Sequence, residues 1–175
     1  IGVAASVEER QGKCLEEGVD VDDVLQKGLR AGTSVVGEAF KHNRLCVPLV
    51  LSAARAMKAG MAVLKPLLTE TAATASRGTI VMGTVKGDLH DIGKNLVCMM
   101  AEGAGFTIIN LGVDTSADEF LEAAKENNAG IVGMSALLTT TMPYMTTVID
   151  AFSQEGLDEI RMCIGGAPVS GKFAE

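Results

Sequence analysis

The sequence predicts an α/β fold in which a doubly wound parallel sheet is preceded by an all-α helical bundle. Before residue 70 the apolar residues recur at helical spacing, as in Val24, Leu25 and Leu29. After residue 78, short β-branched runs alternate with amphipathic stretches, which is the pattern of repeated βα units. The expected domains are a helical domain over 1–70, a linker over 71–78 and an α/β domain over 79–175.

Capping signals divide the helical half. Asp22 or Asp23 is the expected N-cap of one helix, and Pro48 suits the first turn of the next. That second helix should end over 64–68. The small polar residues over 69–78 have the composition of a linker.

Four strands are expected after the linker, because four runs are almost continuously apolar and would be buried on both faces of a parallel sheet. They cover 79–85, 106–111, 130–135 and 161–164. A flavodoxin-like (Rossmann-like) strand order of 2-1-3-4-5 would open a crevice at the carboxyl ends of strands one and three. Since that order has a fifth strand, we expect the last strand and helix to be missing from the chain.

Helices should connect these strands. One is expected over 92–104. A second should begin at a capping box formed by Ser116 and Glu119 and run to about Asn127. A third should begin near Pro143.

The composition argues against several partners and compartments. The formal net charge of −7, without a dense cluster of Lys or Arg, makes nucleic acid an unfavourable partner. No basic-then-apolar leader and no apolar run of membrane-spanning length are visible, so we expect a cytoplasmic protein that does not enter a membrane. The scattered cysteines form no C-x-x-C pair, which suggests reduced thiols. Cys46, Cys98 and Cys163 are expected to serve packing.

The segment directly after the first expected strand carries the candidate chemistry. It contains Asp88, His90 and Gly93 in the pattern D-x-H-x-x-G. An exposed imidazole in such a loop is a good ligand for a cobalt ion, and the carboxylate at position 88 can orient the ring and fix its tautomer. Gly93 lets the backbone turn tightly and lets a large ring approach. Gly165 and Gly166, after the fourth strand, could do the same for a long substituent.

Simpler interpretations compete for these residues. A lone histidine in a loop is usually structural, and Ser135 could merely cap a strand end. Asp91 and Asn95 fit the first turn of a helix, where Lys94 would be solvated. A phosphate-binding loop is disfavoured, because five residues rather than four separate the glycines and Asn95 replaces the required hydroxyl.

Three linked motifs make the chain resemble the cobalamin-binding proteins, whose signature is D-x-H-x-x-G, then S-x-L, then G-G. The second motif here is Ser135 and Leu137, and the third is Gly165 and Gly166, at intervals like those of the family. The resemblance implies that the histidine displaces the cofactor's own dimethylbenzimidazole from cobalt. It also implies that the nucleotide tail enters a slot between the sheet and a helix.

The resemblance assigns roles to individual residues. The cofactor would be cobalamin or a related corrinoid in a methylcobalamin/Co(I) cycle, with His90 as the ligand to cobalt. Asp88, His90 and Thr141 would form the catalytic relay. The expected cofactor-binding residues of the α/β domain are Asp88, His90, Asp91, Ile92, Gly93, Ser135, Leu137, Thr139, Gly165 and Gly166.

The helical half resembles the cap that methionine synthase and the methanogen- and acetogen-type corrinoid proteins place over the upper face of the ring. Phe40, Val47 and Val50 fall on positions that shield the cobalt-bound methyl group, and they complete the expected cofactor-binding set. Two features depart from the family pattern. Cys46 stands where methionine synthase has a large aromatic residue, and the first helix of the usual four-helix cap is not recognisable.

The function that this resemblance implies is a methyl shuttle without turnover of its own. A substrate-specific methyltransferase would load the cofactor, and a corrinoid:acceptor methyltransferase would pass the methyl group to tetrahydrofolate or a similar acceptor. A reductive activase is a further candidate partner. Two alternatives remain: a subunit of an adenosylcobalamin mutase, against which the helical cap argues, and a cobalamin-dependent sensor, for which no output module is visible.

Overall fold

The computed structural model describes residues 4–67 and 76–174 of the chain. The chain divides into two compact units. The first unit is helical and comprises Ile1–Ser76 and Met99–Gly105. The second unit contains the sheet and comprises Arg77–Cys98 and Phe106–Glu175.

Over residues 4–67, the helical unit contains five successive helical segments. They are α1 (Ala4–Glu16), α2 (Val21–Asp23), the π-helical η1 (Val24–Arg30), α3 (Ala31–Lys41) and α4 (Val47–Leu64). Since α2, η1 and α3 follow one another without a break, 21–41 forms one long helix with a π-helical middle. Residues 71–75 of the expected linker lie outside the described residues.

The N-cap of this long helix is Asp20, not Asp22 or Asp23 as the sequence suggested. One carboxylate oxygen of Asp20, Oδ1, accepts hydrogen bonds from the backbone N–H groups of Asp22 and Asp23, at 2.9 Å and 3.4 Å. Three aspartates in a run of four all suit a helix start. The first of them satisfies the orphan N–H groups, while the other two lie in the first turn, where the helix dipole favours negative charge.

Helix α4 is the central helix of this unit. It is long and apolar enough, by length and composition, to cross a membrane, so the expectation that no such run exists was wrong. Its buried residues Val50, Met57 and Leu64 lie on the side that packs against α1, η1 and α3, and Arg55 and Lys58 are exposed. A stripe of buried apolar residues opposite exposed cations makes α4 amphipathic.

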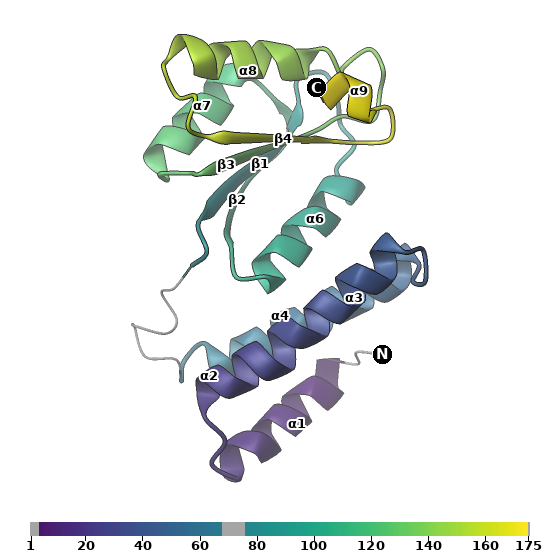
Figure 1. Cartoon of the computed structure of the whole chain (residues 1–175), viewed down its shortest axis with the longest axis vertical. Helices are drawn as coiled ribbons and strands as arrows, with labels where there is room; N and C mark the ends of the chain where they lie inside the picture. Colours follow the sequence, from purple (N-terminus) through teal and green to yellow (C-terminus); the bar gives the residue numbers. More distant parts are fainter. Residues whose placement is uncertain (1–3, 68–75, 175) are drawn as a thin grey trace. The chain divides into compact units, whose positions relative to one another are not determined.

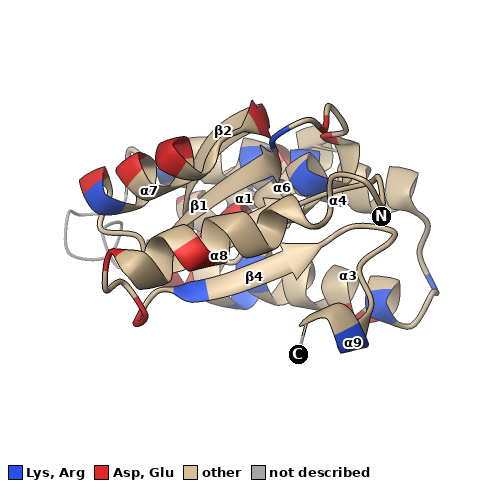
Figure 2. Cartoon of the chain, turned by 90° about the horizontal axis from the view of Figure 1, so that it is seen from above, with Lys and Arg blue, Asp and Glu red and all other residues tan. Residues whose placement is uncertain are grey.

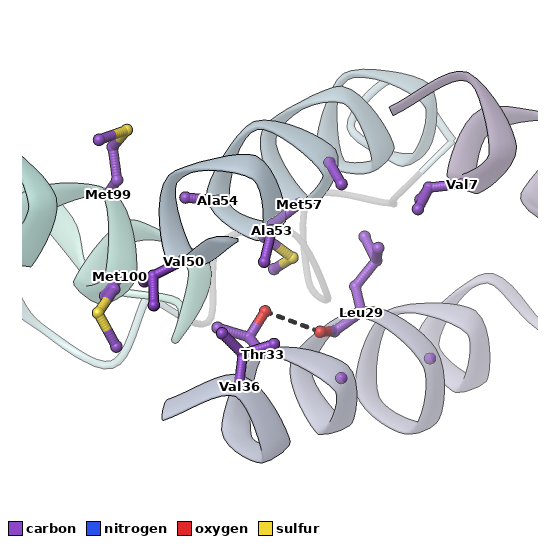
Figure 3. A pocket seen from close by; sticks show the side chains of 13 residues that line it. Val7, Leu29, Thr33, Val36, Val50, Ala53, Ala54, Met57, Met99 and Met100 are labelled. Carbon is purple, nitrogen blue, oxygen red and sulfur yellow. Dashed lines mark hydrogen bonds between the residues drawn. The ribbon is translucent and has the colours of Figure 1, made fainter. Parts of the chain in front are cut away.

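The helical unit encloses an apolar cavity of about 260 Å³ (Figure 3). Its lining includes Val7, Leu29, Val36 and Val50. Thr33 is a polar exception, but its hydroxyl donates a hydrogen bond to the carbonyl of Leu29 at 2.9 Å, as Figure 3 shows. The cavity therefore offers apolar surface and no free charged group.

The second unit is a parallel four-stranded sheet with the order β2-β1-β3-β4, which confirms the doubly wound α/β class. Helices α7 and α8 cover one face and α6 lies on the other (Figure 1). The strands are β1 (Thr79–Val85), β2 (Thr107–Thr115), β3 (Ile131–Ser135) and β4 (Arg161–Gly165). The helices are α6 (Ile92–Gly103), α7 (Ala117–Glu126), α8 (Tyr144–Gln154) and α9 (Gly171–Ala174).

Strand β2 continues four residues beyond its expected end at residue 111. The sequence there, Gly112 and Asp114 included, suggests a turn, and both residues have positive φ angles of 84° and 56°. The strand stays paired because two register shifts absorb the irregular backbone, so that Val85 still pairs with Thr115. The end of β2 is thereby carried alongside the end of β1.

The core of the α/β unit lies between the sheet and helices α7 and α8. Phe120 and Phe152 are its largest buried side chains. Gly83 makes room for one of them, since a Cβ at this position would lie 2.6 Å from Cζ of Phe120. The capping box predicted at Ser116 and Glu119 is confirmed at the start of α7.

The solvent side of α7 is acidic, and α8 adds one carboxylate (Figure 2). Its carboxylates include Asp118, Glu122 and Glu126 on α7 and Asp150 on α8. This surface has the wrong sign for a phosphate backbone.

Candidate functional site

The loop between β1 and α6 contains a fully buried carboxylate. Asp88 is 0% exposed, and its two oxygens accept five hydrogen bonds. Oδ1 accepts from the backbone N–H of His90 at 3.1 Å and from its ring Nδ1 at 2.7 Å. Oδ2 accepts from the N–H groups of Leu137 and Leu138, at 2.8 and 3.2 Å, and from the Thr141 hydroxyl at 2.7 Å. Asp88 thus ties the loop after β1 to the loop after β3.

The hydrogen bonds keep Asp88 ionised. Burial alone would raise its pKa, but the donors from Thr141, His90 and the backbone of Leu137 lower it and together prevail. The pKa of Asp88 therefore lies well below the ordinary range of an aspartic acid.

This depressed pKa predicts a loss of stability in acid. The unfolded chain has an Asp pKa of about 3.9, so below that value it binds a proton that native Asp88 does not. The stabilising contribution should be complete above about pH 5 and should decline as the pH falls below roughly 4. Urea unfolding between pH 3 and 7 measures this slope. The Asp88→Asn variant should show a shallower slope, and an equal slope in both proteins would contradict the assignment.

The imidazole of His90 is held in one tautomer with one nitrogen free. Because the Asp88 carboxylate can only accept, Nδ1 carries the proton and the lone pair of Nε2 is available. The side chain is 52% exposed. The carbonyl of His90 accepts a hydrogen bond from the buried hydroxyl of Thr84 at 2.9 Å, which ties the backbone of the loop to β1. A carboxylate that orients the ring from its other nitrogen is the usual support of a metal-binding histidine.

Within the described residues, His90 does not belong to a cluster of metal-ligating side chains. Among residues 4–67 and 76–174, no group of three or more His, Cys, Asp or Glu side chains could hold a metal ion. Large apolar side chains are exposed around it instead, namely Leu89 at 72% and Leu137 at 43% on the two loops and Ile92 at 76% at the start of α6. A single nitrogen donor on an apolar surface suits a metal that brings its other ligands in a macrocycle.

Beside this loop, the sheet and α6 border a cavity of about 300 Å³. The register of β1, β3 and β4 places Thr84, Ser135 and Gly165 side by side at the carboxyl edge. A Cβ on Gly93 or Gly165 would meet no atom within 4 Å, so these glycines leave the space open. The cavity is lined by Met82, Gly93, Lys94, Val97, Gly133, Met134, Ser135, Cys163, Ile164, Gly165 and Gly166.

Gly166 is required by the backbone itself. Its φ is 137°, and a Cβ there would collide with the carbonyl oxygen of Ala136. We expect Gly166→Ala to destabilise the protein by about 2–3 kcal/mol, since neither backbone segment can move without breaking the sheet edge. Thermal unfolding measures this loss. Gly171→Ala serves as the control, because a Cβ there meets nothing, and an equal effect of both changes would contradict the explanation.

Lys94 and two cysteines differ from their expected surroundings. Lys94 is 3% exposed rather than solvated. Its Nζ donates to the side-chain oxygens of Asn95 and Asn110, at 2.8 and 2.7 Å, because the first turn of α6 lies over β2. Cys46 and Cys163 are exposed rather than packed, and Cys163 lines the cavity.

The structure brings two groups of predicted site residues together. Asp88, His90 and Thr141 are hydrogen-bonded, and Leu137 adds a backbone N–H. The cavity collects the second group, Gly93, Ser135, Gly165 and Gly166.

The remaining predicted residues lie outside these two groups. Asp91 accepts a hydrogen bond from Asn95, and Ile92 and Thr139 are exposed. In the helical unit, Phe40 is half-buried, Val47 is 38% exposed and Val50 is 1% exposed against the internal cavity.

Three residues of the site were missed from the sequence. Thr84 and Leu138 contribute through the His90 carbonyl and the Asp88 carboxylate. Asp114, at the end of β2, accepts a hydrogen bond from the N–H of Gly87. Thr84 stands out only as a polar residue in an apolar strand, and the other two carry no signal in the sequence.

One oriented histidine on an apolar surface and a glycine-lined cavity beside it are the features expected of a protein that binds a metal macrocycle with a long substituent. Residues 78–175 match the family of the B12 binding domain, and residues 2–65 match a second family of that description. The chain therefore belongs to the B12-binding corrinoid proteins of methyltransferase systems, and the residues present fit that cofactor.

Named relatives support this placement. Dimethylamine corrinoid protein 1 of Methanosarcina acetivorans is 43% identical over 99% of this chain and 79% of its own length. A corrinoid protein of Desulfitobacterium hafniense is 41% identical over 97% of this chain and 80% of its own length. Trimethylamine corrinoid protein 1 of Methanosarcina acetivorans is 40% identical over 99% of this chain and 80% of its own length.

Solved structures agree with the sequence relatives. The methanol:cobalamin methyltransferase complex MtaBC of Methanosarcina barkeri has a chain with a TM-score of 0.85 and 30% identity, covering 97% of this chain and 65% of that one. A cobalamin-binding protein of Desulfitobacterium hafniense has a TM-score of 0.75 and 33% identity, and the match covers 98% of this chain and 85% of that one.

Proposed function

We propose that the chain carries a methyl group on the cobalt of its corrinoid between two methyltransferases. The observation that carries this proposal is His90, whose Nε2 is free and whose Nδ1 is hydrogen-bonded to a buried carboxylate. The bound corrinoid supplies the nucleophilic metal, and the protein supplies ligation, shielding and docking.

Residues of the α/β unit would hold the cofactor. Nε2 of His90 is the ligand to cobalt, and Asp88 keeps the proton on Nδ1 while Thr141 donates to the same carboxylate. A proton gained or lost along this relay would couple ligation to the charge of the metal. The cavity lined by Gly93, Ser135 and Gly165 would take the nucleotide tail.

The helical unit would shield the upper face. Phe40 and Val47 have accessible surface for this purpose. Val50 is buried against the internal cavity, so it would support the shielding residues from behind.

The first partner would be a substrate-specific methyltransferase that uses a methylated amine or methanol. The named relatives are dimethylamine and trimethylamine corrinoid proteins, and the MtaBC structure is a methanol:cobalamin methyltransferase complex. A second methyltransferase would pass the methyl group to tetrahydrofolate or a similar carrier, and a reductive activase would restore the reduced cofactor.

The proposal is tested by loading the purified chain with hydroxocobalamin, reducing it and adding a methyl donor with its methyltransferase. We expect the visible spectrum to change to that of methylcobalamin, and the methyl group to be lost again when an acceptor methyltransferase and tetrahydrofolate are added. Preferential retention of adenosylcobalamin, with no methylation by any of the donors named, would contradict the proposal.

A further inference from the structure

Asp114 forms hydrogen bonds with the backbone on both sides of the Gly87-Asp88 pair in the loop after β1. Its side-chain Oδ1 accepts a hydrogen bond from the N–H of Gly87 at 2.7 Å. Its own backbone N–H donates to the carbonyl of Asp88 at 3.0 Å. These bonds join the end of β2 to the loop after β1, independently of the contacts that Asp88 makes with the loop after β3.

The backbone of Asp114 is held in an unusual conformation to make these bonds. Its φ is 56°, in the left-handed region, and Gly87 opposite has a φ of 83°. Among residues with a side chain, Asp and Asn enter this region most readily. Asp114 is therefore suited to its position in two separable ways, as an acceptor for Gly87 and as a residue that tolerates the turn.

We propose that Asp114 is a positioning residue for the metal-binding histidine. Asp88 must point into the protein while His90, two residues later, points out, so the backbone of Gly87 and Asp88 has to be fixed. Asp114 fixes it from the side opposite to Thr141 and Leu137. The inference rests on the proposed function, because it assumes that Nε2 of His90 binds the metal.

Three substitutions separate the two contributions. Asp114→Asn keeps both the acceptor and the tolerance of the left-handed region. Asp114→Gly keeps only the tolerance, and Asp114→Ala keeps neither. Asn128→Gly is a matched control, since Asn128 also has a positive φ, of 46°, but lies at the end of α7.

Each variant is loaded with hydroxocobalamin and reduced to Co(II), and the nitrogen splitting in the electron paramagnetic resonance spectrum is followed during acid titration. The midpoint at which the imidazole leaves cobalt should rise by about one pH unit in Asp114→Gly, the tenfold weakening expected for one lost charge-assisted hydrogen bond. In Asp114→Ala the midpoint should rise at least as far. In Asp114→Asn, whose neutral oxygen still accepts the hydrogen bond, it should rise by less than in Asp114→Gly, and in Asn128→Gly it should equal that of the parent.

A purely structural role would lower the unfolding midpoint of Asp114→Gly and leave the imidazole midpoint unchanged, which would overturn the inference. Failure of the proposed function looks different. In that case the parent itself would lack the histidine nitrogen splitting, and His90→Ala would have the same spectrum as the parent.

Discussion

Replacing Asp88 with alanine should lower the free energy of unfolding by about 3–5 kcal/mol. The change removes the acceptor of five hydrogen bonds inside a fully buried site. The N–H groups of Leu137 and Leu138 would lose their acceptor, and donors left without an acceptor inside a protein are costly. The hydroxyl of Thr141 would keep only the carbonyl of Leu138 as its acceptor. Urea unfolding of the cofactor-free chain measures the loss.

Asp150→Ala is the matched control, because Asp150 is an exposed aspartate of α8 and should change stability by no more than about 0.5 kcal/mol. Asp88→Asn should fall between the two. Its amide retains one oxygen but places an NH2 group against donors from His90 or from the loop after β3. Stability of Asp88→Ala equal to that of the control would show that Asp88 does not hold the two loops together.

Replacing Gly165 with leucine should weaken binding of cobalamin by about 100-fold, the effect of about 3 kcal/mol of overpacking. The side chain would enter the cavity proposed for the nucleotide tail, where a Cβ meets no protein atom. The free protein should therefore fold normally. Cobinamide, which lacks the nucleotide tail, should bind the variant and the parent equally well.

Gly130→Leu provides the control for this experiment. Gly130 lies at the opposite, amino end of β3, and a Cβ there also meets no atom. Equilibrium titration of the parent and both variants with each corrinoid measures the six affinities. If Gly165→Leu weakened cobinamide and cobalamin alike, the cavity would not be the site of the tail.

The class of fold was predictable because its signals are local. The runs of β1, β3 and β4 are almost continuously apolar, and the capping box at Ser116 and Glu119 is visible in sequence. Asp88 and His90 are also close in sequence, so a hydrogen bond between them needs only one loop. Thr141 lies 53 residues from Asp88, and its expected place depended on the resemblance to the cobalamin-binding proteins.

The parts that sequence did not predict depend on tertiary contacts. Lys94 is buried because Asn110 of a neighbouring strand accepts its hydrogen bond. The extension of β2 relies on register shifts that compensate for Gly112. Asp20 becomes the N-cap only because its carboxylate, rather than that of Asp22, reaches the first N–H groups. In each case the local sequence pattern does not decide the outcome, and contacts in the folded protein do.

The bond from His90 to cobalt is tested most directly by isotopic labelling. The chain contains two histidines, His42 and His90. Protein labelled with ¹⁵N-histidine is loaded with unlabelled cobalamin and reduced to Co(II), and its electron paramagnetic resonance spectrum is recorded. We predict that the nitrogen splitting changes from the triplet of ¹⁴N to the doublet of ¹⁵N, also in His42→Gln, and disappears in His90→Ala. A triplet that persists in the labelled protein would show that the lower ligand is the cofactor's own base.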